Sequence, residues 1–327
     1  MRLLVIRRAE ELSVRGRSTI VIRVEGRTIE RGLRDVDAVL IIGSHVRLSS
    51  ALPPVLSAHN IPLAIMAKDS VSILVNPILT RYNSYRRLQY QLDRNRALEI
   101  AAGYIESKIR GMQNILKYHK VEAVEVPPPP GMPDNSNPDD YELEIRLWES
   151  TASHALWGKL LDLLEPDVLD RLRSEYGFRG RAPRHPDPFN KTLSVMYAVL
   201  YSLATKALIA AGLDPTYGFL HRTRYSTPLT FDYTEMFKPI AIQAAVELVN
   251  KNGLPELDPD GELARDAVNS AVRQLYSYLT LRHKYTGRTP YQQIHLKAFC
   301  LARHLEGKCA KGKLTITWDR RQYRAKH

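Results

Sequence analysis

The stretch GLDPTYGFLHRTRYSTPLTFDYTEMFKP runs from Gly212 to Pro239. It places an imidazole, His221, ahead of two carboxylates, Asp232 and Glu235, which lie three residues apart in an apolar pattern typical of a helix. Positions i and i+3 share a helical face, so both acids can point the same way. Carboxylates directed into a fold are costly unless an opposite charge compensates them, and a divalent cation with an imidazole ligand is one such compensation. The stretch therefore predicts a metal site in a helical part of the fold.

Each candidate residue also has a purely structural interpretation. His221 beside apolar residues is typical of a satisfied core or capping histidine. Asp232 is a favoured N-cap residue, and Glu235 three residues later would complete a capping box. Glu149 lies in an apolar stripe directly after Trp148, where a solvated helix acid is common, although the small side chains that follow it leave room for a ligand. The residues alone leave both interpretations open.

Composition and charge indicate which classes of function the sequence favours and which it disfavours. The chain has 327 residues, of which 44% are hydrophobic and 25% charged, as in ordinary soluble globular proteins. Lys and Arg number 47 against 35 Asp and Glu, which gives a formal net charge of +12. Such an excess favours a polyanionic partner, most commonly nucleic acid, although a charge-rich surface alone can produce it. P-loop, GxGxxG, GxSxG and HExxH patterns do not occur, which disfavours P-loop nucleotide hydrolysis, Rossmann chemistry and zinc proteolysis.

The cysteines and the N-terminus bear on the cellular compartment. Cys300 and Cys309 show no CxxC spacing, which excludes a disulfide framework and a cysteine-rich zinc module and leaves the two thiols without a role. The N-terminal sequence MRLLVIRRAEELSVRGR has no apolar core of a signal peptide, and no uninterrupted apolar segment approaches the ~20 residues that span a bilayer. We expect a cytoplasmic protein with no membrane contact.

The sequence pattern changes near residue 78. We expect an α+β protein in which a small N-terminal, mainly β domain (1–78) precedes a larger all-α domain (79–327). A hairpin turn is predicted at Glu25-Gly26, and a short helix capped by serine is predicted over Ala51–Ala58. The predicted strands are β-branched or apolar runs at Leu3–Ile6, Thr19–Val24, Ala38–Ile42, Leu63–Met66 and Val71–Val75.

The second domain shows helical periodicity interrupted by two loops. Residues 127–140 are rich in proline and predict a solvent-exposed loop, and the basic segment FRGRAPRHPDP (Phe178–Pro188) predicts another. Gly212 is predicted to end the most apolar helix. The predicted helices are Tyr82–Lys120, Glu142–Leu164, Pro166–Tyr176, Asn190–Ala211, Asp232–Asn250, Leu263–Leu281 and Pro290–Leu305.

Several motifs occur together in one order. A basic loop precedes D-P-x-N at 187–190 and an N-x-x-L-x-x-x-Y-x-x-L-Y helix that ends at Tyr201. GLDPTYGFLH leads into His221, and a D-x-x-E pair is followed by F-K-P. Upstream lie Glu149 and the segment AVLIIGSHVRLSSALPPVLSAHNIPLAIM (Ala38–Met66). This combination resembles the CRISPR-associated spacer integrases, the Cas-one family. Ser150 and Lys238 depart from the usual Gly and Arg of that pattern.

The resemblance implies a metal-dependent DNA endonuclease and integrase of CRISPR adaptation, which inserts short captured DNA into the repeat array by transesterification. It implies that Glu149, His221 and Glu235 bind Mg²⁺ or Mn²⁺, with Asp232 a further catalytic acid in the same pocket. Asn190 and Tyr197 would lie around the metal ligands and help to position them without binding the metal. The DNA-binding residues that it implies are Arg179, Arg181, Arg184, Arg222, Arg224 and Lys238.

The resemblance further implies partners. These are DNA, as spacer precursor and as CRISPR repeat, a second copy bound through the β domain, and a small protein of the Cas-two family. Two alternatives remain: a generic structure-selective nuclease such as a branched-DNA resolvase, and a non-catalytic helical nucleic-acid-binding protein whose acids are caps and surface charges. Sensitivity to chelators and the joining of DNA into a repeat array distinguish the three.

Overall fold

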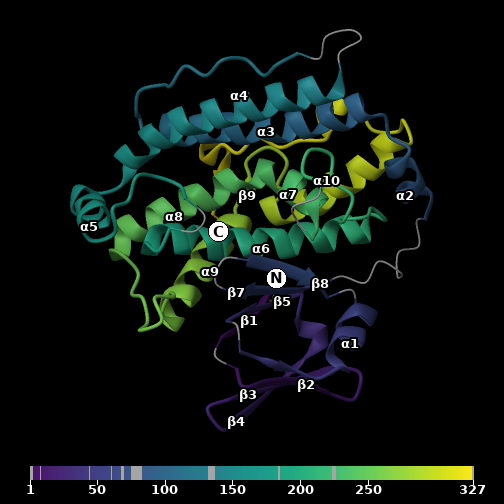
Figure 1. Cartoon of the computed structure of the whole chain (residues 1–327), viewed down its shortest axis with the longest axis vertical. Coiled ribbons are helices and arrows are strands. Elements are labelled where there is room, and N and C mark those ends of the chain that lie inside the picture. Colours follow the sequence, from purple (N-terminus) through teal and green to yellow (C-terminus); the bar gives the residue numbers. More distant parts are fainter. Residues whose placement is uncertain are drawn as a thin grey trace.

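The computed structural model describes residues 3–7, 9–43, 45–59, 61–67, 70–74, 83–131, 137–182, 185–222 and 226–325. Strands of the N-terminal part of the chain gather in the lower part of the view in Figure 1, and helices form most of the rest. The predicted α+β class and its order along the chain are confirmed.

Two four-stranded sheets build the N-terminal part. In the order β1-β5-β7-β8, the first three strands of one sheet are parallel and the last is antiparallel to its neighbour. The other sheet has the order β4-β3-β2-β6. Strands β2 and β6 are not predicted by the sequence pattern, because β2 mixes charged and apolar residues and β6 has only two residues. The bounds are β1 Leu3–Arg7, β2 Glu11–Arg15, β3 Thr19–Val24, β4 Arg27–Gly32, β5 Ala38–Ile42, β6 Arg47–Leu48, β7 Leu63–Ala67 and β8 Ser70–Leu74.

The predicted hairpin turn is confirmed. Val24 of β3 pairs with Arg27 of β4, and the two residues between them have φ values of 51° and 72°. Positive φ at both central positions is the geometry of a type I′ turn, which matches the twist of the flanking strands. The short helix α1 (Leu52–Ala58) also forms, with Ala51 and not a serine at its N-cap, while the Ser49 hydroxyl accepts a hydrogen bond of 3.3 Å from the Ala51 N–H just ahead of the helix.

Strand β5 connects the two parts of the molecule. Side chains alternate across a strand, so successive residues face opposite layers. Leu40 and Ile42 belong to the core that the helices build, whereas Val39 and Ile41 belong to a smaller core formed with the second sheet and α1. The sheet β1-β5-β7-β8 is therefore a middle layer, and the N-terminal part shares its core with the helical part.

Nine α-helices follow α1 among the residues that the structure describes. A two-stranded sheet of β9 (Arg282–His283) and β10 (Tyr323–Arg324) also lies in this region, so the prediction of an all-α second domain is wrong in this detail. The helices are α2 Asn83–Tyr90, α3 Arg94–Tyr118, α4 Pro138–Leu160, α5 Pro166–Tyr176, α6 Pro188–Ala210, α7 Pro228–Thr234, α8 Lys238–Asn252, α9 Arg265–Leu279 and α10 Pro290–Leu305. Short 3₁₀ turns occur at η1 Leu33–Asp35, η3 Leu161–Leu163, η4 Glu235–Phe237, η5 Lys311–Lys313 and η6 Arg320–Gln322.

Helix α6 is the central element of the helical part. By length and composition it could cross a membrane, but 83% of its most apolar window is buried inside the fold, which identifies it as a core helix. Lys191 and Lys206 interrupt the apolar run, which is why the sequence shows no continuous segment of that length. One face of α6 packs against β5 and β7, and α7, α8, α9 and α10 surround it.

Several helix bounds differ from those predicted. The single helix expected over Tyr82–Lys120 is divided into α2 and α3, because Asp93 caps α3 by accepting a hydrogen bond from the Arg96 N–H at 3.1 Å. Helix α4 begins at Pro138, so residues 138–140 belong to its first turn and not to the predicted loop. Leu143 and Leu147 of this helix are 56% and 59% exposed.

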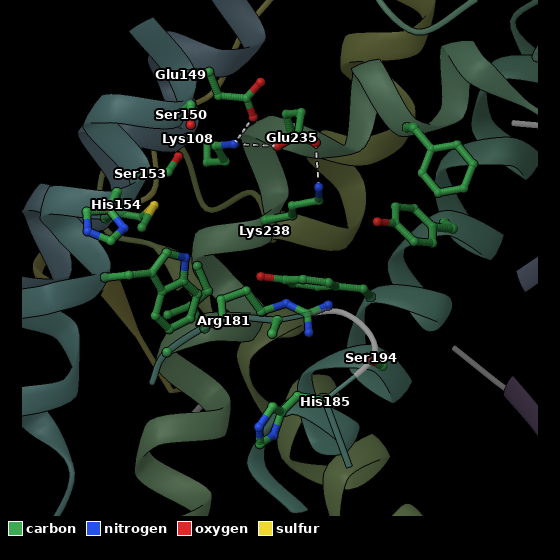
Figure 2. Close-up of a pocket in the computed structure, with 18 of the residues that line it drawn as sticks. Lys108, Glu149, Ser150, Ser153, His154, Arg181, His185, Ser194, Glu235 and Lys238 are labelled. Atoms are coloured by element: carbon green, nitrogen blue, oxygen red, sulfur yellow. Dashed lines mark hydrogen bonds and ion pairs between the residues drawn. The ribbon is translucent and has the colours of Figure 1, made fainter. Parts of the chain in front are cut away.

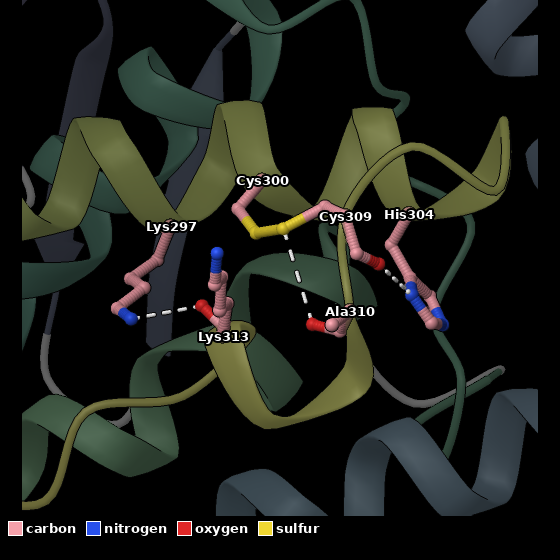
Figure 3. Close-up of a disulfide and its surroundings, with 6 residues drawn as sticks. All are labelled: Lys297, Cys300, His304, Cys309, Ala310 and Lys313. Carbon is pink, nitrogen blue, oxygen red and sulfur yellow. Dashed lines mark hydrogen bonds between the residues drawn. A yellow bond between two sulfur atoms is a disulfide. The ribbon is translucent and has the colours of Figure 1, made fainter.

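The two cysteines have a structural role that their spacing does not predict. Cys300 of α10 and Cys309 form a disulfide with a Cα–Cα distance of 5.8 Å (Figure 3). In the same region the Lys297 ammonium donates a hydrogen bond of 2.8 Å to the Lys313 carbonyl, which also ties α10 to the chain that follows it. The disulfide therefore holds the segment after α10 against that helix.

Candidate functional site

A cavity of about 1610 Å³ opens among the helices, with part of its wall supplied by β7 and β8. Figure 2 shows charged side chains arranged along it. The wall contains two acids, Glu149 and Glu235. It also contains the imidazoles of His154, His185 and His221 and the cations of Lys108, Arg146, Arg179, Arg181 and Lys238.

The two acids meet at one ammonium group. Lys108, from α3, donates a hydrogen bond to Glu149 Oε1 of α4, and its Nζ lies 3.0 Å from Glu235 Oε2 of η4. The Lys238 ammonium, from the first turn of α8, donates to the other oxygen of Glu235. Four elements, α3, α4, η4 and α8, thus bring acids and lysines into one alternating row (Figure 2).

Burial strengthens these charge interactions. Burial by itself would raise the pKa of Glu235, but the ammonium groups of Lys108 and Lys238 outweigh it and lower that pKa to about 2. Burial would lower the pKa of Lys108, whereas Glu235 and then Glu149 oppose this, and the net shift is upward. Glu235 and Lys108 are therefore both charged at neutral pH.

His221 is held by the carboxylate of Asp232. That carboxylate accepts hydrogen bonds from the backbone N–H groups of Phe219, Leu220 and His221 at 2.6, 3.0 and 3.1 Å. His221 Nδ1 lies 2.6 Å from Asp232 Oδ1. Hydrogen bonding of Nδ1 to a carboxylate fixes the ring and directs Nε2 to the other side.

Asp232 therefore differs from its predicted roles. It lies inside α7 after Thr227 at the N-cap, so the capping interpretation is wrong. Its side chain is 1% exposed, and it is not among the described residues that line the cavity. Glu235 and His221 do line it, as does Glu149. Of the four predicted catalytic residues, Glu149, His221 and Glu235 line the cavity. Asp232 does not line it, but its carboxylate holds the His221 ring in place.

The donor set suits a hard divalent cation. Two carboxylates and an imidazole are ligands of Mg²⁺ or Mn²⁺, and Glu235 Oε2 is a buried carboxylate oxygen that the Lys108 ammonium compensates from 3.0 Å. Across the described residues, however, no three His, Cys, Asp or Glu side chains are gathered closely enough to hold a metal. The Lys108 ammonium lies between the two carboxylates instead. The residue types fit a cation, and Lys108 occupies the position that would bring the carboxylates together.

The basic loop before α6 is organised by Asn190. Its side chain accepts hydrogen bonds from Arg181 and from the Ala182 N–H at 2.9 and 3.0 Å and donates one of 3.0 Å to the Gly180 carbonyl. The buried ring of Tyr197 lies between two cations, 5.3 Å from the Arg181 guanidinium and 5.4 Å from Lys238 Nζ. Asn190 and Tyr197 therefore position the cations of the cavity.

The predicted DNA-binding residues divide into three groups. Arg179, Arg181 and Lys238 line the cavity. Arg222 is exposed and outside that lining. Arg184 and Arg224 lie outside the described residues.

His185 and Lys108 are two of the polar wall residues that the sequence does not predict. His185 Nδ1 lies 2.7 Å from the fully buried carboxylate of Asp187, so a second imidazole–carboxylate pair borders the cavity. The burial of Lys108 could have been recognised from the sequence, because Lys108 falls on the apolar stripe of α3 with Tyr104, Ile105 and Met112. A lysine at such a position must find buried counter-charges.

Comparisons with known proteins agree with the motifs. The family model described as CRISPR associated protein Cas1 matches residues 3–279. A CRISPR-associated endonuclease Cas1 2 of Saccharolobus solfataricus is 29% identical over 265 residues, 76% of this chain and 78% of that protein. Among solved structures, a casposase bound to integration product aligns with a TM-score of 0.75 at 21% identity, over 97% of this chain and 94% of that one. A chain of a Cas6-RT-Cas1–Cas2 complex aligns with a TM-score of 0.72 at 19% identity, over 97% of this chain and 36% of that one.

Proposed function

Because the chain belongs to the CRISPR-associated Cas1 family, we propose that it is a metal-dependent DNA endonuclease and integrase of CRISPR adaptation. The observation that carries this proposal is the convergence of Glu149, His221 and Glu235, from three separate segments, on one cavity lined by arginines and lysines. Acids and an imidazole suit a divalent cation, and the surrounding cations suit the phosphates of DNA.

Each residue has a chemical role in this proposal. Glu149, His221 and Glu235 hold Mg²⁺ or Mn²⁺, which when bound polarises the phosphodiester and stabilises the leaving oxyanion. Asp232 keeps the His221 ring in place. Arg179 and Arg181 bind phosphate oxygens and orient the strand, and Lys238 links Glu235 to the face of Tyr197.

The reaction exchanges one phosphodiester for another. The 3′-hydroxyl of the captured DNA gives up its proton to solvent as its oxygen bonds to a phosphorus of the repeat, and the bond from that phosphorus to its original 3′-oxygen breaks. The displaced oxygen takes up a proton and leaves as a 3′-hydroxyl. The number of phosphodiester bonds does not change, so the cavity needs only to position the strands and neutralise charge.

The proposed partners are DNA, a second copy of the chain joined through the N-terminal sheets, and a small protein of the Cas2 type. A structural relative bound to an integration product supports the first, and one in a Cas1–Cas2 complex supports the last. We propose that the protein acts in the cytoplasm, where its DNA substrates are.

The test measures plasmid cleavage, and joining of short duplexes into a repeat-containing plasmid, with Mn²⁺ and with EDTA. Glu149→Ala, His221→Ala and Glu235→Ala should each reduce both activities at least ~100-fold, as expected for lost electrostatic stabilisation, while DNA binding persists. Glu144→Ala is the matched control, because Glu144 lies on the same helix with an exposed side chain away from the cavity.

Other outcomes would support other functions. Normal activity in any of the three variants would remove that residue from the site. Binding without cleavage in either condition would favour a non-catalytic nucleic-acid-binding protein. Cleavage of branched DNA without joining into the repeat would favour a resolvase.

A further inference from the structure

The position of Lys108 bears on how the site binds its cation. Its ammonium is the one group that contacts both Glu149 and Glu235 among the described side chains. The Lys108 side chain is 10% exposed and that of Glu235 is 5% exposed. Charges so far from water interact strongly, and a buried carboxylate without a counter-charge is costly. Lys108 therefore stabilises two carboxylates that would otherwise repel each other.

A divalent cation bound there would likewise compensate the negative charges of the Glu149 and Glu235 carboxylates. A cation held by Glu149 and Glu235 cannot share the space between them with an ammonium, because both would contact the same carboxylate oxygens and like charges repel. Binding of one therefore requires displacement of the other.

The cavity offers an acceptor for the displaced group. Ser153 follows Glu149 by four residues on α4, so both side chains share one face of that helix. The Ser153 hydroxyl is buried without a hydrogen bond in the described part of the chain, and Ser153 lines the same cavity as Lys108 (Figure 2). A hydroxyl in that state gains from accepting a bond from an ammonium.

We propose that Lys108 is an internal counter-ion which the divalent cation must displace, so that it weakens cation binding and preserves the fold of the site between binding events. This inference rests on the proposed metal-dependent function and adds a regulator of its cation affinity. Lys108 is a positioning residue here, since it acts through the proposed ligands Glu149 and Glu235 that it contacts.

The first test measures Mn²⁺ binding to the full chain by electron paramagnetic resonance of the free ion, without DNA. Lys108→Met removes the charge and keeps the side-chain length, so its Kd for Mn²⁺ should fall at least ~10-fold relative to the wild type. Lys206→Met is the matched control, because Lys206 is also partly buried and paired with an acid, Asp37, outside the cavity. Its Mn²⁺ affinity should equal that of the wild type. Unchanged or weaker binding by Lys108→Met would overturn the inference.

A thermal unfolding measurement adds an independent readout. In EDTA, Lys108→Met should unfold at a lower temperature than the wild type, because Glu149 and Glu235 lose their counter-ion. Added Mn²⁺ should raise the unfolding temperature more for this variant than for the wild type, since a ligand that binds the folded state stabilises it in proportion to the logarithm of its relative concentration. An equal Mn²⁺-induced rise in the two proteins would contradict the proposal.

A chemical measurement on the wild type covers the case in which the variant does not fold. The amine of Lys108 should react with a small acylating reagent faster in Mn²⁺ than in EDTA, as mass spectrometry of digested protein can quantify, because displacement separates it from its carboxylates. The reactivity of Lys206 should be the same in both conditions. Equal labelling of Lys108 in both would overturn the proposal.

The two proposals fail in different ways. If Glu235→Gln leaves Mn²⁺ binding intact, the metal site itself is wrong and the proposed function falls with it. If Glu235→Gln abolishes Mn²⁺ binding while Lys108→Met leaves the wild-type affinity unchanged, only the role of Lys108 is wrong.

Discussion

At the scale of single residues, Asp232 determines where His221 lies. Its two oxygens accept three backbone hydrogen bonds from 219–221 and face the His221 ring. Gly218 makes this close wrapping possible, because a Cβ there would collide with the His221 carbonyl oxygen and lie 2.7 Å from Pro228 Cβ. One buried carboxylate thus shapes a whole loop.

Replacement of Asp232 by asparagine should therefore disturb both stability and cation binding. The new amide NH₂ would face backbone N–H groups that need an acceptor, and hydrogen bonds to a charged group are each worth ~1.5–3 kcal/mol. We expect Asp232→Asn to lower the free energy of unfolding by about 3 kcal/mol and to raise the Kd for Mn²⁺. Urea unfolding and Mn²⁺ titration measure the two effects.

The control for this substitution is Asp214→Asn. Asp214 also accepts a backbone hydrogen bond, from Thr216 at 2.8 Å, but it is only half-buried, and its further hydrogen bonds from the hydroxyls of Thr216 and Tyr90 lie at the exposed surface. Its replacement should cost less than ~1 kcal/mol, as most surface changes do. Equal losses for the two variants would mean that burial of the Asp232 carboxylate does not matter.

The residues of the site divide by how far the sequence can predict them. His221 and Glu235 lie within a recognisable motif, and Glu149 falls on a helix with small neighbours. The contact of Lys108 with both acids depends on the packing of α3, which no local pattern encodes. His185 could not be distinguished from an ordinary loop residue until Asp187 was seen to be buried beside it.

At the scale of elements, Gly111 sets the distance between α3 and α8. A Cβ at Gly111 would lie 2.7 Å from Cγ and 2.9 Å from Cβ of Pro239. Lys108 precedes Gly111 by three residues and shares its helical face. The close approach at Gly111 therefore brings Lys108 to Glu235, which lies just before α8.

Gly111→Ala should consequently force the two helices apart. Overpacking of a close contact costs ~1–3 kcal/mol, and we expect a loss of that size in urea unfolding. Gly158→Ala on α4 is the matched control, because a Cβ there meets nothing within 4 Å. Removing a glycine from a helix should raise its stability by up to ~1 kcal/mol. A stability for Gly111→Ala that equals or exceeds that of the wild type would show that the contact at Pro239 is not tight.

Prolines explain which element bounds the sequence predicts. Helices α5 and α10 begin at the predicted prolines, Pro166 and Pro290. Helix α4 begins at Pro138, inside a predicted loop, and α7 begins at Pro228, ahead of the helix start predicted at Asp232. Proline is favoured in the first helical turn because its missing N–H has no partner there. All four prolines thus lie in a first helical turn, and the sequence pattern alone predicts this for two of them.

At the scale of the whole molecule, not all of the positive charges are available to bind a partner. The formal net charge is +12, yet part of it compensates buried acids and is not available for a partner. Lys108 and Lys238 contact Glu235. Arg179 lines the cavity with an exposed side chain. DNA affinity should therefore depend on where a cation lies and not on net charge alone.

The salt dependence of DNA binding tests this distinction. Each phosphate that a cation neutralises in duplex DNA contributes ~0.9 to the slope of log K against log salt. Arg179→Ala should reduce the slope for short duplexes by about 1 and weaken binding uniformly across sequences. Arg27→Ala removes the same charge from β4, at the opposite end of the molecule (Figure 1), and should leave the slope unchanged. If both variants changed the slope equally, binding would follow the overall field of the protein, and the cavity would not be the surface that receives the DNA backbone.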